Sequence, residues 1–208
     1  MSDIKMNQTT LGPKFEEALL FANRIHAEQK RKDSGAPYLA HVLGVAALVL
    51  EDGGSEEEAI AAVLHDAAED QGGEEILTEI RDKFGEKISQ IVRECSDTLI
   101  SPKPPWKRRK EYHLGVLKSA LPETIRVMQA DKVYNARNLQ RSLIEHGPQT
   151  WQNFKGGREG TLWYFRQMYA LLSKVRSGYL MMEFARLIEV IEAFPLADSD
   201  SEEPDERG

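Results

Sequence analysis

Residues 64–70 of this 208-residue chain read Leu-His-Asp-Ala-Ala-Glu-Asp, so one imidazole and three carboxylates fall within a short stretch. An apolar run leads into them and predicts a helix that packs into a core. On such a helix residues four apart are neighbours, which sets His65 beside Glu69 and Asp66 beside Asp70. Burying so many polar groups without partners is costly. We therefore expect a bound cation or a solvent-filled cleft at this end of the helix.

Two residues elsewhere in the chain could join His65 and Asp66. His41 lies near the start of another predicted helix, where a single histidine is more typical of a cap or a core position. Asp131 lies within a long helical segment although Asp is a poor helix former, and Asn135 follows one turn later on the same face. Alone, Asp131 is typical of a solvated face. Together, two imidazoles and two carboxylates suit a divalent first-row metal such as Mn²⁺, Fe²⁺, Zn²⁺ or Co²⁺.

A metal held by only four protein groups keeps positions open for water or substrate. Such a site lowers the pKa of a bound water and polarises a phosphoryl oxygen. Glu69 and Asp70 then exceed the number of ligands required. They could orient the water, accept its proton or hold a second hydrated cation.

The spacing of apolar residues, interrupted by Gly and Pro, predicts helices throughout and gives no convincing strand. Ser55 before three glutamates is typical of a helix start, and Pro122 suits a first helical turn. The predicted helices cover residues 15–30, 38–51, 55–71, 74–84, 86–98, 106–120, 122–144, 159–175 and 179–194, with a short one at 151–154. We expect an all-α domain over residues 13–195. A flexible arm, residues 1–12, is expected before it and a disordered acidic tail, residues 196–208, after it.

The formal net charge of −7 is concentrated in the acidic tail, and the near-neutral body gives no reason to expect a long nucleic acid as partner. The single cysteine, Cys95, is more typical of a core thiol than of a nucleophile and fits a reducing compartment. No apolar leader or membrane-length apolar run is present. We therefore expect a soluble cytoplasmic protein without a membrane partner. Its last two helices could form either core or a subunit interface, so the oligomeric state stays open.

Residues 103–110 contain five Lys or Arg side chains around Pro104, Pro105 and Trp106. They could simply be an exposed helix start, although cations there oppose the helix dipole. Alternatively, they could form a phosphate clamp that closes over the site. The role of the acidic tail is equally open.

The order His41, His65-Asp66, Asp131 resembles the HD-domain metal-dependent phosphohydrolases. A longer set of residues between positions 15 and 172 resembles, more narrowly, the hydrolase domain of the RelA/SpoT family and its stand-alone members, the small alarmone hydrolases. This set comprises Ala22, His26, Gln29-Lys30-Arg31-Lys32, Gly35-Ala36-Pro37-Tyr38 and His41, then Leu64-His65-Asp66 and Glu69-Asp70, then Ala130-Asp131-Lys132, Tyr134-Asn135 and Arg137-Asn138-Leu139. One departure is Val42, where the family usually has proline.

The resemblance implies an HD-domain helical bundle of about nine or ten helices. It implies one Mn²⁺, or another first-row metal, bound by His41, His65, Asp66 and Asp131. Glu69 and Asp70 would activate the attacking water. The substrate would be contacted by Arg31, Lys32, Asn135 and Tyr164.

The reaction implied is removal of the 3′-pyrophosphate from guanosine 3′,5′-bis(diphosphate), ppGpp, or from pppGpp, to give GDP or GTP and pyrophosphate. The same metal site could act on ppApp or on the 2′-phosphate of NADPH. A non-catalytic HD domain that senses a nucleotide is a further alternative. A sensor of that kind would be expected to lose metal ligands or the Glu-Asp pair, and this chain retains all six residues.

Overall fold

The computed structural model describes residues 9–32 and 34–195, and these form ten α-helices and one 3₁₀ helix. They are α1 (Pro13–Ile25), α2 (Leu39–Glu51), α3 (Glu56–Leu64), α4 (Ala67–Gln71), α5 (Glu74–Phe84), α6 (Glu86–Cys95), α7 (Trp106–Leu117), α8 (Pro122–His146), η1 (Gly147–Asn153), α9 (Gly157–Val175) and α10 (Tyr179–Glu192). Within these ranges, extended pairing is limited to an isolated bridge between Lys30 and Pro37. The prediction of an all-α bundle of nine or ten helices is confirmed.

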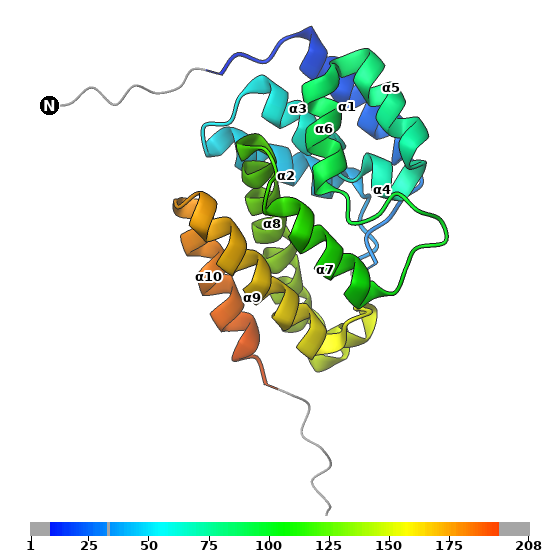
Figure 1. Ribbon diagram of the computed structural model, residues 1–208. Helices are drawn as coiled ribbons and strands as arrows, with labels where there is room; N and C mark the ends of the chain where they lie inside the picture. Colours follow the sequence, from blue (N-terminus) through cyan, green and yellow to red (C-terminus); the bar gives the residue numbers. More distant parts are fainter. Residues whose placement is uncertain (1–8, 33, 196–208) are drawn as a thin grey trace, which may run out of the picture.

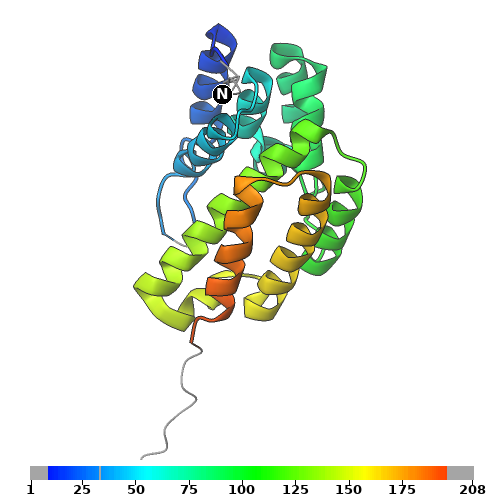
Figure 2. The same ribbon diagram turned by 90° about the vertical axis from the view of Figure 1, so that its left-hand side faces the viewer.

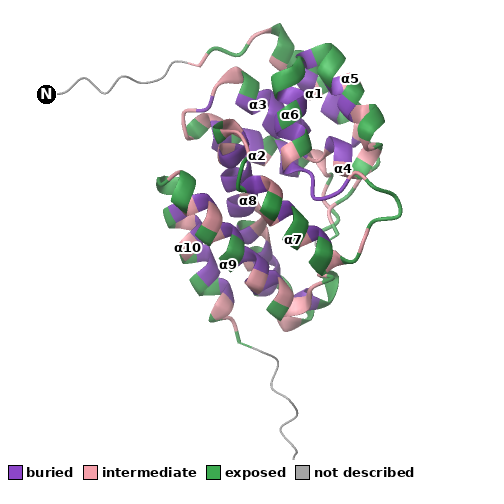
Figure 3. Cartoon of the chain, viewed as in Figure 1, coloured by how far each residue is buried: buried purple, intermediate pink, exposed green. Residues whose placement is uncertain are grey.

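The long helix α8 passes through the whole molecule (Figures 1 and 2). Helices α1 to α6 gather around one end of it, and α7, α9 and α10 gather around the other (Figure 1). Helix α8 packs against α2, α3 and α6 in the first group and against α9 and α10 in the second. The buried residues line the faces that these helices turn toward one another (Figure 3). A side chain in the middle of α8 is therefore placed where the two groups meet.

Helix α3 is a core helix that begins with a complete capping box. The Ser55 hydroxyl accepts from the Glu58 N–H, and the Glu58 carboxylate accepts from the Ser55 N–H at 2.7 Å. Glu58 also pairs with Arg126 of α8, whose guanidinium lies 3.2 Å from Asp52. Every residue from Glu58 to Leu64 is buried. The helix that leads to His65 is thus fixed at its start and packed on all sides.

The prediction of one continuous helix over residues 55–71 is wrong, because the chain leaves the helix at His65 and Asp66. The His65 Nδ1 lies 2.8 Å from the Ala62 carbonyl oxygen, which a continuous helix would offer to the Asp66 N–H. The chain re-enters a short helix, α4, that ends before Gly73. At Gly73 φ is +59°, and a Cβ would lie 2.9 Å from the Leu99 carbonyl oxygen.

The first helix ends at Ile25 rather than near residue 30, because the next residues fold into a loop. The Tyr38 N–H donates to the Gln29 carbonyl at 2.9 Å, and the Arg31 N–H donates to the Ala36 carbonyl at 2.8 Å. These bonds hold Arg31 beside the start of α2. Among the described residues no helix is long and apolar enough to cross a membrane.

The predicted domain limits remain predictions. The acidic tail, residues 196–208, and the first eight residues of the predicted arm lie outside the described residues. Thr9 and Gly12, at the end of that arm, contact the start of α3. The Thr9 hydroxyl donates to the Gly54 carbonyl at 2.8 Å, and the Gly12 N–H donates to Glu56 at 2.7 Å.

Candidate metal centre and catalytic cleft

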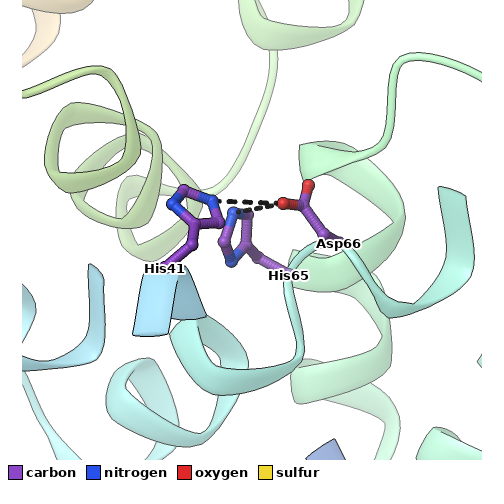
Figure 4. A group of neighbouring side chains, drawn as sticks. All are labelled: His41, His65 and Asp66. Atoms are coloured by element: carbon purple, nitrogen blue, oxygen red, sulfur yellow. Dashed lines mark ion pairs between the residues drawn. The ribbon is translucent and has the colours of Figure 1, made fainter. Parts of the chain in front are cut away.

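Four side chains converge in the core: His41 from α2, His65 and Asp66 from the break between α3 and α4, and Asp131 from α8. Figure 4 shows the first three. The His41 Nε2 lies 3.2 Å from Asp66 Oδ2 and 3.4 Å from Asp131 Oδ1. The His65 Nε2 lies 3.1 Å from Asp66 Oδ2 and 3.6 Å from Asp131 Oδ1. We refer to His41, His65, Asp66 and Asp131 as the inner cluster. The predicted ligand residues, which are up to 90 positions apart in the chain, are thus brought together.

The spacing of these atoms fits a divalent metal. With metal–ligand bonds of about 2.1 Å, neighbouring ligand atoms lie about 3.0 Å apart in an octahedron and about 3.4 Å apart in a tetrahedron. The hydrogen-bond pattern fits as well. The His65 Nδ1–H donates to the Ala62 carbonyl, which leaves Nε2 as the ring nitrogen that faces the two carboxylate oxygens. That Nε2 is buried and has no hydrogen-bond partner among the described residues. A cation would satisfy it.

Neighbouring residues hold the two carboxylates of the inner cluster in place. The Tyr38 hydroxyl donates to Asp66 Oδ2 at 2.5 Å. Asp131 accepts from Lys132 Nζ at 2.6 Å and from Asn135 Nδ2 at 2.5 Å. Burial raises the pKa of Asp131, but Lys132 and His65 outweigh it and hold that pKa well below its usual range. Asp131 is therefore ionised and ready to bind a cation, with its free rotation removed by these partners.

His41 is positioned by aromatic packing. The Tyr134 ring lies 5.1 Å from the His41 ring, between centroids, and the Tyr38 ring lies 5.4 Å from it. Tyr134 reaches this position because residue 44 is glycine. A Cβ at Gly44 would lie 2.0 Å from the Tyr134 ring. The close approach of α2 and α8 at this point therefore supports the orientation of His41.

Glu69 and Asp70 face a lysine from the loop between α6 and α7. The Lys103 Nζ lies 3.0 Å from Glu69 Oε1 and 3.2 Å from Asp70 Oδ1. Asp70 also accepts from the Gln29 amide at 2.8 Å. Burial raises the pKa of Glu69, and the carboxylates of Asp97 and Asp66 raise it further. A carboxylate with a raised pKa beside a candidate metal site is suited to accept a proton from water.

Asp97 joins this pair to the cations of α7. Its backbone N–H donates to Glu69 Oε2 at 3.1 Å, and its carboxylate pairs with Arg109 and with Lys110, the latter at 2.7 Å. Burial raises the pKa of Asp97, but Lys110 and Arg109 outweigh it and lower the pKa to about 2. Asp97 thus carries a fixed negative charge that holds two cations at the edge of the cleft.

The basic stretch at residues 103–110 divides between two directions. Lys103, Arg109 and Lys110 line the cleft beside Glu69. Lys107 points elsewhere, with its Nζ 2.8 Å from the centre of the Trp163 ring. Arg108 lines a separate groove. Part of the stretch therefore faces the site and part lies on the outside of α7. A role as a phosphate clamp stays a prediction.

The cavity consists of a small inner chamber of about 160 Å³ and an outer cleft of about 480 Å³. Arg31 lines both and donates to Asn135 at 3.2 Å, and Asn135 in turn contacts Asp131. Lys32 is exposed and lines only the outer cleft. Tyr164 is buried and lines the inner chamber. All four predicted substrate residues therefore border the cavity, and their roles in binding substrate stay predictions.

Several residues of the site were not singled out as functional from the sequence. Tyr38 and Lys132 contact the inner cluster, and Asp97 and His113 line the chamber. Tyr38 and Lys132 each lie within three positions of a predicted ligand, so their place in the sequence could have identified them as residues of the site. Asp97 and His113 offer no such signal, because only the packing of α6 and α7 brings them to the cavity.

Comparison with known proteins agrees with this geometry. A family model described as an HD domain matches residues 18–162. A solved structure described as a metazoan orthologue of SpoT that hydrolyses ppGpp superposes with a TM-score of 0.73 at 24% identity, covering 87% of this chain and 97% of the other. The match to the family model, together with the fold, shows that the chain is an HD-domain protein.

Two curated relatives have names that specify a reaction. The human guanosine-3′,5′-bis(diphosphate) 3′-pyrophosphohydrolase MESH1 is 36% identical over 132 residues, which are 62% of this chain and 71% of the human protein. A guanosine-3′,5′-bis(diphosphate) 3′-pyrophosphohydrolase of Aquifex aeolicus is 34% identical over 60% of this chain and 17% of its own length. The chain belongs to the family of guanosine-3′,5′-bis(diphosphate) 3′-pyrophosphohydrolases, as its resemblance to the small alarmone hydrolases predicted.

Proposed function

We propose that this protein removes the 3′-pyrophosphate from ppGpp or pppGpp, with GDP or GTP and pyrophosphate as products. The observation that carries the proposal is the position of the Glu69–Asp70 pair between the inner cluster and a wall of cations. This arrangement provides a place for a divalent metal, a proton acceptor and compensation for a highly charged phosphate ester. The names of the relatives support the same substrate.

The reaction is hydrolysis of the ester between O3′ and phosphorus. A water oxygen bonds to the phosphorus, the bond from phosphorus to O3′ breaks, and O3′ takes up a proton to become the hydroxyl of GDP. In phosphoryl transfer most of the catalysis comes from positioning and from neutralising charge. In the proposed mechanism Glu69 accepts the proton of the water and Asp70 orients it. Arg31, Lys103 and Lys110 neutralise the phosphates, and the Arg31 guanidinium can bind two oxygens at once.

We propose Mn²⁺ as the metal, held by His41, His65, Asp66 and Asp131. A divalent cation bound there would polarise the phosphoryl oxygen and lower the pKa of water. The mixed nitrogen and oxygen donor set also accepts other first-row metals. Tyr38, Lys132 and Asn135 keep the carboxylates in place whichever ion binds.

The alternatives concern the substrate rather than the chemistry. Hydrolysis of ppApp, or of the 2′-phosphate of NADPH, would use the same inner cluster with different contacts in the outer cleft. A non-catalytic sensor is disfavoured because the four candidate ligands lie together and both acids line the adjoining inner chamber.

The test is turnover by the purified protein supplied with Mn²⁺ and, separately, ppGpp, pppGpp, ppApp and NADPH. We expect release of pyrophosphate from ppGpp or pppGpp. Glu69→Ala should lower turnover by about 10²- to 10⁴-fold while leaving the bound metal in place. Asp66→Ala should abolish both turnover and metal binding. The proposal is contradicted if the wild-type protein turns over none of the four nucleotides. Unchanged turnover in Asp66→Ala would contradict the site assignment.

A further inference from the structure

His113 of α7 lies in the wall of the inner chamber and contacts Tyr164 of α9. It is 2% exposed. Its Nδ1 lies 3.1 Å from the Tyr164 hydroxyl oxygen, and its Nε2 lies 3.0 Å from the Glu94 carbonyl oxygen. Both ring nitrogens are therefore occupied by specific partners, one of which faces the site.

These partners determine which nitrogen carries the proton. A carbonyl oxygen only accepts, so Nε2 must be protonated to bond with Glu94. Burial lowers the pKa of His113 to about 4, with Lys132 and Lys110 adding to the effect, so the ring is neutral near pH 7. In a neutral ring the other nitrogen, Nδ1, has a lone pair and accepts. It follows that the Tyr164 hydroxyl donates its only proton to His113.

The hydroxyl of Tyr164 consequently presents only acceptor lone pairs to the chamber. The ring itself is held near two ammonium groups, with Lys110 Nζ 4.9 Å and Lys132 Nζ 5.3 Å from its centre. An oxygen that can only accept repels the oxygens of a phosphate, whereas it binds a hydroxyl group. Phosphate oxygens bind more favourably to the ammonium groups of the two lysines. The Tyr164 hydroxyl therefore suits a donor group of the nucleotide.

The sugar supplies such a donor. Tyr164 lines the same chamber as His41, Asp66 and Asp131. If the ester at O3′ is cleaved at that cluster, the neighbouring hydroxyl on the sugar is the one at C2′. We propose that His113 is a positioning residue that holds the Tyr164 hydroxyl oxygen as an acceptor for the 2′-hydroxyl of the substrate. This inference rests on the proposed function, because the substrate and the reacting ester come from it.

A double-mutant cycle tests whether His113 acts through Tyr164. Tyr164→Phe should raise KM for ppGpp about fivefold with kcat changed less than twofold, as expected when one binding contact is lost. His113→Leu should give a similar rise. In the double variant KM should rise by less than a further twofold, because the hydroxyl that His113 positions is already absent in Tyr164→Phe. Equal effects of His113→Leu in both backgrounds would overturn the proposal.

A conservative variant separates positioning from a structural role. In His113→Gln the side-chain amide can still donate to the Glu94 carbonyl and accept from Tyr164, so KM should stay within twofold of wild type. A KM as high as that of His113→Leu would contradict the hydrogen-bond assignment.

The 2′-deoxy analogue of ppGpp tests whether the substrate group that Tyr164 binds is the 2′-hydroxyl. Wild type should bind it about fivefold more weakly than ppGpp, and Tyr164→Phe should not distinguish the two. Equal discrimination by both proteins would exclude the 2′-hydroxyl as the partner.

A measurement without substrate keeps this inference distinct from the proposed function. Nitrogen-15 NMR of the full chain should show the His113 ring protonated at Nε2 and unprotonated at Nδ1, with the Nδ1 signal shifted in Tyr164→Phe. A ring protonated at Nδ1 would overturn the inference even if ppGpp is hydrolysed. Absence of ppGpp turnover together with the expected tautomer would place the failure in the substrate assignment instead.

Discussion

The inner cluster and the outer rim of the cavity are built in different ways. Two ligands of the inner cluster project from the core helices α2 and α8, and two come from the short break that follows α3. The side chains of His41, His65 and Asp131 are at most 7% exposed. The rim comes largely from the loops at residues 26–32, 34–38 and 96–105 and from α7, and it includes charged side chains that pair with one another, such as Lys103 with Glu69 and Asp70. Lys103, for example, is 38% exposed at the side chain.

This difference separates two tasks. Ligands on packed helices and on a short break between two of them keep their geometry whether or not substrate is present, which a metal site requires. Ion pairs that reach solvent are weaker than fully buried ones, so the half-exposed Lys103 can leave Glu69 and Asp70 for a phosphate. The chemistry should therefore depend on the inner cluster, and affinity and substrate choice on the rim. The predictions below test this division, from the largest expected effect to the smallest.

Removing a ligand of the inner cluster should have the largest effect. In His65→Ala and Asp131→Ala we expect loss of bound metal and a fall in kcat of more than about 100-fold, since even outer partners of metal ligands cost 10- to 100-fold. Metal analysis of the purified variants and steady-state kinetics would measure both. His146→Ala, which changes a histidine far from the cavity at the end of α8, is the matched control and should match wild type. Retention of metal by Asp131→Ala would remove Asp131 from the ligand set.

Glu69 lies at the boundary between the two regions and should affect the pH profile. As a base it must be ionised, so kcat/KM should fall as the pH drops through its pKa. Burial, Asp97 and Asp66 raise that pKa, which places the acidic limb of the profile above the usual range of glutamate. Glu69→Gln should lower kcat by about 10²-fold or more, retain the metal and lose this limb. An unchanged acidic limb in the variant would assign the base to another group.

The inner cluster was also the more predictable region. His65 and Asp66 stand out because two further acids follow within four positions, and Asp131 because Asp is unusual within a helix. The break at His65 was not predictable, because it depends on the His65 ring taking the Ala62 carbonyl. That choice follows from tertiary packing rather than from local propensity.

The rim was predictable in composition but not in orientation. The sequence shows a run of cations at residues 103–110, yet only the placement of α7 decides that Lys110 faces Asp97 while Lys107 covers Trp163. Likewise, His113 contacts Tyr164 across 51 positions of the chain. Such pairings depend on how α7 packs against α9. The periodicity of apolar residues does not predict which residues of these two helices lie opposite each other.

A smaller effect should follow from crowding behind the inner cluster. In Gly44→Ala the new Cβ would overlap the Tyr134 ring, so we expect a loss of about 1–3 kcal/mol in the free energy of unfolding. Because Tyr134 packs on His41, metal affinity should fall by about 10-fold. Denaturant unfolding and metal titration would measure the two effects. Gly115→Ala, on α7 with open space around it, is the control and should stabilise the helix slightly. Normal metal affinity in Gly44→Ala would show that His41 does not depend on Tyr134.

The smallest effect is expected at the rim. Lys103→Ala should raise KM for ppGpp about fivefold at low ionic strength, with kcat nearly unchanged, and the difference should shrink as salt screens the charge. Because Lys103 is one of the cations that lower the pKa of Glu69, its removal should also move the acidic limb of the pH profile to higher pH. Lys107→Ala is the matched control, since that lysine contacts Trp163 instead of the two acids. A large fall in kcat in Lys103→Ala would mean that the rim takes part in the chemical step, and the division between the two regions would no longer hold.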